Sequence, residues 1–225
     1  MSKGEIEKIL KEQQLKNIQE VREHINDKEY DLKINNLIKL FDGKLTREQI
    51  YQEVYNSDIA ALHLSKDSKK QNLVETHVLN KLKEINPTFI KLPPNGKDSI
   101  RFTPEGKLIY GCKNKTVFKD SKSVDYYSEI NGRKWYYAQK YTTGEGGAQD
   151  NQYKDAITFI ENGLKNENRD FGIGLILDGD YYHNKDRIDN LKNEYNNKPN
   201  CIVISLETIS QEEINFLKGD KNESL

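Results

Sequence analysis

Cysteine, methionine and tryptophan are scarce in this chain: its 225 residues include two cysteines, one methionine and one tryptophan. Cys112 and Cys201 lie far apart, with no CxxC or Cys/His spacing around either. A zinc site is therefore not expected. In a reducing compartment a disulfide is not expected either.

Long apolar runs are also missing. No stretch approaches 18 consecutive apolar residues, and the start MSKGEIEKIL lacks the apolar run of a signal peptide. The hydrophobic fraction is 35% and the charged fraction 32%, which is typical of a protein with a polar surface. We therefore expect a cytoplasmic protein with no membrane segment.

A charge excess of either sign is absent too. Lys and Arg number 35 against 36 Asp and Glu, which leaves a formal net charge of −1. This balance excludes an overall basic footprint for nucleic acid. Any contact with DNA has to come from local basic patches.

The first part of the chain has a helical pattern. Apolar residues between Ile6 and Ile25 recur at mostly helical spacing, with charges between them. Thr46 is followed three residues later by Gln49, which predicts a capping box at a helix start. We expect a helical N-terminal subdomain over residues 1–65, for packing or dimerisation, and a second domain over residues 66–225.

The second domain combines helical patterns with strand-like runs. Residues 66–84 form an amphipathic helical pattern, followed by a loop and by the short strand-like runs KLIYGC and KTVFK. From residue 123 the order is ββαβαβ, with FGIGLILDG and CIVISLETI as buried strands. The predicted fold is α/β: a mixed central sheet with flanking helices, plus the helical N-terminal subdomain.

The best-defined local feature is a hairpin around Asn131-Gly132, a dipeptide typical of two-residue turns. Continuing its register places Tyr127 opposite Tyr136 and Asp125 opposite Ala138. Opposed residues, and residues two apart on one strand, share a face of the sheet. Asp125, Ala138 and Lys140 should therefore lie on one face, whereas Gln139 points to the other and is assigned no chemistry.

This face has the pattern of a metal site from which one carboxylate is missing. An acid at position 138 would stand against Asp125 and would need a cation between the two carboxylates. Mg²⁺ accepts one or two carboxylates together with water and phosphate oxygens. Lys140 would orient the attacking water and neutralise the charge that develops on the phosphate.

The stretch SVDYY…WYYAQKYTTGEGG resembles the PD-(D/E)XK nuclease motif, with Asp125 as first acid and Ala138-Gln139-Lys140 in place of (D/E)-X-K. SKKQNLVETHVLNKL resembles the preceding helix of the FokI-type cleavage domain, with Glu75 at its acidic position. The segment from GLILDGD to the strand CIVISLETI resembles the strand-helix-strand that closes that domain. The same part of the chain also resembles restriction enzymes of the DpnII type.

The resemblance covers roughly residues 68–210. It implies a restriction-endonuclease-like core, a type II restriction endonuclease that requires Mg²⁺, double-stranded DNA as substrate, and a homodimer. The implied catalytic positions are Asp125, Ala138, Lys140 and Glu75, and the implied metal positions are Asp125, Ala138 and Glu75.

The chain departs from the family pattern at two positions, the residue before the first acid and the second acid itself. Val124 stands where the motif has proline, a variation that this loosely defined superfamily tolerates. Ala138 removes a metal ligand, so either the natural chain lost activity or alanine was introduced for glutamate to allow DNA binding without cleavage. Because Asp125, Lys140, Glu75 and the TTGEGG loop remain, we favour the second interpretation.

Candidate DNA contacts surround this strand. Lysines before Asp125 suit phosphate contact, although lysines also protect a solvated edge strand from aggregation. The loop TTGEGGAQDNQ is either a plain connection capped by Asp150 or a DNA-reading loop, since glycine permits close backbone approach and amides read bases. The predicted DNA-binding residues are Lys119, Lys122, Thr142, Thr143, Gly144, Gln149, Asn151 and Gln152.

Two alternatives remain. Asp178, Asp180, His183 and Asp186 form an acidic cluster that could hold a metal, but their order also fits a strand end leading into a helix N-terminus. At the level of function, the alternative to the nuclease is a non-catalytic DNA-binding or regulatory module on a nuclease-like scaffold. A helical interaction protein with an α/β domain would leave the face of Asp125 and Lys140 unexplained.

Overall fold

The computed structural model describes residues 3–65, 70–111, 121–142, 144–166 and 170–220. The chain divides into two compact units. One is Gly4–Val74, and the other is Glu75–Leu225 together with the first three residues. The division falls inside helix α5 (Lys70–Ile85). The boundary expected after residue 65 stays a prediction.

The first unit is helical. Buried apolar side chains from its helices form one core, which includes Val21, Ile34 and Val54. The predicted capping box is present: the Thr46 side chain accepts from the Gln49 backbone, and the Gln49 side chain accepts from the Thr46 backbone. The helices are α1 (Lys3–His24), α2 (Lys28–Leu40), α3 (Arg47–Asn56) and α4 (Asp58–Leu64).

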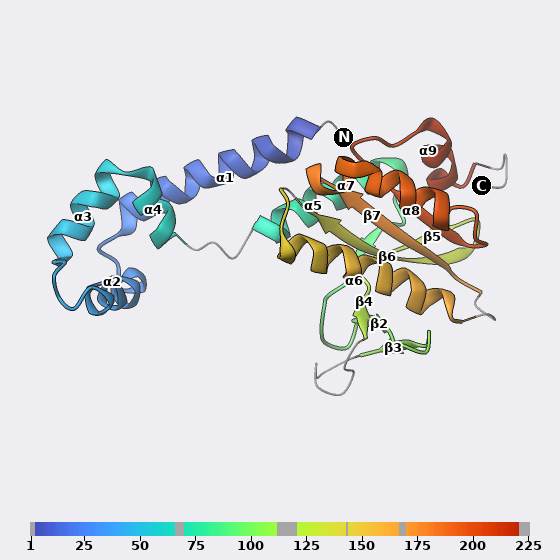
Figure 1. Ribbon diagram of the computed structural model, residues 1–225, viewed down its shortest axis with the longest axis horizontal. Coiled ribbons are helices and arrows are strands. Elements are labelled where there is room, and N and C mark those ends of the chain that lie inside the picture. The colour runs from blue at the N-terminus through green and yellow to red at the C-terminus, as the bar shows by residue number, and fades with distance from the viewer. Residues whose placement is uncertain (1–2, 66–69, 112–120, 143, 167–169, 221–225) are drawn as a thin grey trace. The chain divides into compact units, whose positions relative to one another are not determined.

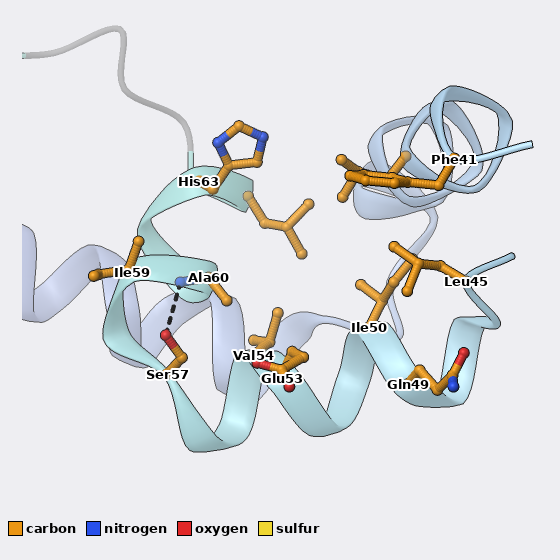
Figure 2. Close-up of a pocket in the computed structure, with 12 residues that line it drawn as sticks. Phe41, Leu45, Gln49, Ile50, Glu53, Val54, Ser57, Ile59, Ala60 and His63 are labelled. Carbon is orange, nitrogen blue, oxygen red and sulfur yellow. Dashed lines mark hydrogen bonds between the residues drawn. The ribbon is translucent and has the colours of Figure 1, made fainter.

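A pocket of about 340 Å³ opens between α2, α3 and α4 of this unit. Its lining is mainly apolar, with Phe41, Ile50 and Val54 around it (Figure 2). Ser57 caps the start of α4 at its edge, accepting from the Ala60 N–H at 3.3 Å. Glu53 and His63 are the titratable residues in its described lining, and we assign this pocket no chemistry.

The second unit is a mixed α/β structure built on a mixed sheet (Figure 1). Among the described residues five strands make this sheet, in the order β1-β5-β6-β7-β8, with β1, β5 and β6 antiparallel and β6, β7 and β8 parallel. Its strands are β1 (Ile90–Lys91), β5 (Tyr126–Ile130), β6 (Arg133–Tyr141), β7 (Gly172–Asp178) and β8 (Cys201–Ile204). The α/β prediction is confirmed at this level.

Helices connect the parallel strands, as predicted from the ββαβαβ pattern. They are α6 (Gly147–Leu164), α7 (Asp180–His183), the short 3₁₀ helix η1 (Asn184–Asp186) and α8 (Arg187–Tyr195), and α9 (Gln211–Lys218) follows β8. Helix α6 begins three residues before Asp150, after Gly146, so the alternative in which Asp150 caps the connection is wrong. The Asp150 carboxylate instead accepts from the Tyr181 hydroxyl at 2.6 Å.

A smaller sheet lies beside this one, in the order β3-β2-β4. It consists of β2 (Ile100–Phe102), β3 (Leu108–Tyr110) and β4 (Lys122–Ser123). Strand β3 corresponds to the predicted run KLIYGC, whereas KTVFK lies outside the described residues. The sheet brings Phe102 onto the core, where its ring meets the edge of Phe159 from α6.

The hairpin has the predicted register. Tyr127 pairs with Tyr136, and Ile130 pairs with Arg133. Asn131 and Gly132 have φ values of 53° and 76°, which is the left-handed backbone that a tight two-residue turn requires. The sequence therefore sets which residue of β5 faces which residue of β6.

The two faces of the sheet are covered differently. Tyr136 and Ala138 of β6 belong to an apolar cluster with residues of α6 and α8. On the other face, Trp135 packs edge-on against Phe216 of α9. Glycines Gly172 and Gly174 of β7 leave room there, since an added Cβ would lie 2.2 Å from the rings of Trp135 and Tyr137 respectively. Among the described helices, none combines the length and the apolar composition of a membrane span.

Candidate functional site

Asp125 stands immediately before β5 and is fixed by backbone bonds on both sides. Its N–H donates to the Tyr137 carbonyl at 2.8 Å, and its own carbonyl accepts from the Leu92 N–H at 2.9 Å. Its carboxylate Oδ2 accepts from the Gln139 N–H at 2.8 Å. The acid is thus held at the point where the chain enters the sheet, between its neighbours on β1 and β6.

Burial raises the pKa of Asp125 to about 6. The Gln139 N–H opposes this shift and lowers the pKa, as do the positive charges of Lys140 and Lys91, while the negative charge of Glu75 raises it. Glu75, Lys91 and Lys140 therefore lie within electrostatic range of the Asp125 carboxylate.

Glu75 reaches this point from helix α5. Its carboxylate pairs with Lys91 of β1 at 2.6 Å, and its backbone carbonyl accepts from the Tyr126 hydroxyl at 2.8 Å. The Glu75 side chain is 16% exposed and that of Lys91 is 29% exposed, so the ion pair is largely buried. Tyr126 directly follows Asp125. Its hydrogen bond to the Glu75 carbonyl holds this turn of α5 next to the start of β5.

Ala138 and Lys140 line one pocket of about 230 Å³ beside β6, as expected for residues two apart on a strand. Its other lining residues in the described part of the chain are Arg101, Ser121, Lys122, Ser123, Asp155 and Phe159. Asp125 is not among them, and its side chain reaches the β6 backbone instead. Ala138 is only 3% exposed and packs in the apolar cluster that also contains Val124.

The pocket carries three cationic side chains and one carboxylate. Arg101 donates to the Ser121 hydroxyl at 2.8 Å and to the Ser121 carbonyl at 3.1 Å, and Lys122 pairs with Asp155 of α6. The Lys140 side chain makes no hydrogen bond or ion pair with a described residue. An arrangement of two positioned cations and one unpaired lysine is suited to a phosphate group.

The predicted DNA-binding residues are spread over several environments. Thr142 is buried, and its hydroxyl donates to the Gln152 side chain at 2.7 Å. Gly144 is exposed with φ of 75°, and Asn151 and Gln152 are exposed on the first turns of α6 rather than on a loop. Gln149 is half-buried on the same turn. Lys119 and Thr143 lie outside the described residues.

The alternative acidic cluster is partly assembled. Asp178 ends β7 and α7 begins at Asp180, as the strand-to-helix reading predicted. Among the described residues Asp178 and His183 form a group with Glu207, a residue that the sequence pattern did not indicate, whereas Asp180 and Asp186 are not part of that group. Burial raises the pKa of Asp178 to about 6.

Two residues beside Asp125, Lys91 and Gln139, and one in the pocket of Lys140, Arg101, escaped the sequence analysis. Lys91 sits on a two-residue strand, Arg101 belongs to the small sheet, and Gln139 acts through its backbone N–H. A signal for Gln139 was available, because the hairpin register brings the backbone after position 138 next to Asp125. Nothing local to Lys91 or Arg101 marked them.

The chain was compared with protein-family models, with curated proteins and with solved structures, and none of them matches it.

Proposed function

We propose that this chain is an endonuclease of the type II restriction class, built to hydrolyse phosphodiester bonds of double-stranded DNA with Mg²⁺, and that Ala138 leaves it inactive. The observation that carries the proposal is a pair of hydrogen bonds. The hydroxyl of Tyr126, the neighbour of Asp125, donates to the Glu75 carbonyl, and the Asp125 carboxylate accepts from the N–H of Gln139, the neighbour of Lys140. These bonds tie helix α5, the start of β5 and the end of β6 together, an arrangement that supports the motif resemblance.

The donors present suit a hard divalent cation. Asp125 has one carboxylate oxygen held by Gln139, while its Oδ1 accepts no hydrogen bond from a described residue. Together with Glu75 it offers the one or two carboxylates that Mg²⁺ uses alongside water and phosphate oxygens. The ion would supply Lewis-acid stabilisation of the phosphate.

The chain's own cations complete the arrangement. Lys140 is free to donate to a non-bridging phosphate oxygen and to neutralise negative charge that develops there. Arg101 and Lys122 line the same pocket and can position the neighbouring phosphate. The proposal includes a homodimer, because two sites related by a two-fold axis cut the two strands of a duplex.

One observation favours a second function, a DNA-binding or regulatory module without catalysis. Ala138 fits its place: its methyl group is buried in the apolar cluster beside Phe159. A native alanine at this position would be well packed, and the basic pocket would then bind phosphate only.

Restoration of the missing acid separates the two functions. Duplex DNA carrying random sequence is incubated with Mg²⁺ and the protein as written, Ala138→Glu, the isosteric control Ala138→Gln, or Ala138→Glu combined with Lys140→Ala. We expect binding without cleavage for the present chain, Mg²⁺-dependent cleavage only for Ala138→Glu, and loss of that cleavage in the double variant. If Ala138→Glu folds and binds DNA yet leaves the library intact, the binding module is correct.

A further inference from the structure

Three polar residues meet at one end of the parallel strands, and none of them lines the pocket of Lys140. Asp178 is the last residue of β7, Glu207 follows the end of β8 by three positions, and His183 ends α7. The carboxyl ends of neighbouring parallel strands lie at one edge of a sheet, which is where α/β proteins commonly place ligands. One oxygen or nitrogen atom of each residue lies within 4.8 Å of the other two.

The two carboxylates are held by the surrounding backbone and by a serine. Asp178 Oδ1 accepts from the Ser205 hydroxyl at 2.8 Å and from the Glu207 N–H at 3.1 Å. Glu207 Oε2 accepts from the Gly179 N–H at 3.2 Å and lies 2.9 Å from His183 Nε2. Each carboxylate therefore has one oxygen that is oriented by fixed donors.

The second oxygen of each carboxylate has no such partner. Asp178 is fully buried, the Glu207 side chain is 3% exposed, and neither Asp178 Oδ2 nor Glu207 Oε1 has a hydrogen-bond donor among the described residues. Leaving a buried charged oxygen unsatisfied costs more than a typical hydrogen bond contributes. A cation bound beside the imidazole would satisfy both oxygens at once.

We propose that Asp178, His183 and Glu207 bind one Zn²⁺ ion. Zn²⁺ accepts imidazole nitrogen and carboxylate oxygen at about 2.0–2.2 Å, whereas Mg²⁺ and Ca²⁺ favour oxygen ligands alone. Ser205 and the Glu207 N–H then act as the outer partners that orient ligating carboxylates. Binding replaces the contact between His183 Nε2 and Glu207 Oε2, and a small side-chain adjustment brings the three ligand atoms onto the ion.

The cysteine pattern does not bear on this site. The expectation that the chain has no zinc site rested on the spacing of Cys112 and Cys201, neither of which belongs to the cluster. The ligands are instead two carboxylates and an imidazole, brought together by β7, α7 and the segment after β8. The inference is also independent of the nuclease proposal, because none of its residues belongs to the group around Asp125.

The direct test is metal stoichiometry on the full, untagged chain. The protein is equilibrated with Zn²⁺, Mn²⁺, Mg²⁺ or Ca²⁺, separated from free ion by gel filtration and analysed by elemental mass spectrometry. We expect about one Zn²⁺ per chain, retained in the presence of excess Mg²⁺, together with a visible absorption band when Co²⁺ is substituted. A wild-type protein that retains no Zn²⁺ and shows no Co²⁺ band overturns the proposal.

Variants locate the ion. His183→Gln should lower the affinity for Zn²⁺ by more than the about 10–100-fold that follows loss of an outer partner. The matched control His63→Gln changes an exposed histidine of the helical unit and should retain the ion. Asp125→Asn should also retain it, which separates this site from the nuclease proposal. Loss of Zn²⁺ from His63→Gln, or full retention by folded His183→Gln, would place the ion elsewhere and overturn the assignment.

Discussion

The backbone N–H of Gln139 donates a 2.8 Å hydrogen bond to the carboxylate of Asp125, fourteen residues away in the sequence. This bond joins the start of β5 to the end of β6, just where the hairpin register places Asp125 opposite Ala138. It holds one oxygen of the acid and leaves the other available. The site around Asp125 is therefore positioned by the sheet itself, and its properties can be tested one residue at a time.

The pH dependence of stability should change in Asp125→Asn. The folded-state pKa of Asp125 is raised from 3.8 to about 6, so the folded protein holds this proton more tightly than the unfolded chain does. The stability that this proton contributes is present below pH 4 and is lost as the pH rises through 6, by up to about 1.4 kcal/mol per pH unit. Asparagine does not titrate, so the Asp125→Asn protein does not lose this stability as the pH rises.

We therefore expect the stability of Asp125→Asn, relative to wild type, to rise between pH 4 and pH 6 and to level off above it. Urea denaturation in EDTA measures this, followed by the fluorescence of Trp135. Trp135 is the single tryptophan of the chain and is buried in the sheet unit, so its signal reports that unit. Parallel pH profiles for the two proteins would show that the Asp125 pKa is not raised.

DNA affinity should depend on Lys140. This lysine has no ion-pair partner among the described residues, so its charge is available to a phosphate. We expect Lys140→Ala to weaken duplex binding and to reduce the salt dependence, the slope of log K against log salt, by about 1. The matched control is Lys134→Ala, an exposed lysine on the same strand. Equal effects of both substitutions, measured by fluorescence anisotropy at several salt concentrations, would argue against a site at the pocket.

Ala138→Glu should lower the melting temperature in the absence of metal. The new carboxylate would be buried in the apolar cluster and opposite Asp125, and we expect a loss of about 1–3 kcal/mol. Mg²⁺ or Ca²⁺ should recover part of this loss, whereas Ala138→Gln should show no response to either ion. Scanning calorimetry with and without metal makes the comparison. A glutamate variant that melts higher without metal, or ignores it, would mean that the two carboxylates are not paired.

Gly174→Ala should destabilise the α/β unit. Its Cβ would lie 2.2 Å from the Tyr137 ring, and overpacking of this kind typically costs about 1–3 kcal/mol. Gly147→Ala is the control, because a Cβ at this first residue of α6 meets nothing within 4 Å. Urea titrations followed by Trp135 fluorescence compare the two. A Gly174→Ala protein as stable as wild type would show that the ring of Tyr137 can move aside.

Local chemistry made much of the fold predictable. The Asn131-Gly132 turn sets the hairpin register because few dipeptides accept two left-handed residues in succession. Thr46 and Gln49 cap a helix through bonds that span three residues. Apolar runs with no alternation identified β7 and β8, since strands covered on both faces have no polar side. These signals act over a few residues, so the sequence alone carries them.

The sites depend on contacts that no local pattern encodes. Glu75 meets Tyr126 across 51 residues, and Asp178 meets the Glu207 N–H across 29. Such pairs form only when the helix and strands pack, because the spacing of apolar residues determines which face is buried but not which distant polar group lies beside it. The sequence by itself determined strands β5 to β8 with the helices between them, the hairpin register and the candidate acid Asp125, but not the short strands β1, β2 and β4. Only the tertiary structure placed Lys91 beside Glu75 and gave Asp125 its bond to Gln139. It also joined Glu207 to Asp178 and His183. The reason is that a buried polar group has no solvent to bind, so it pairs with whatever polar group the packing brings near.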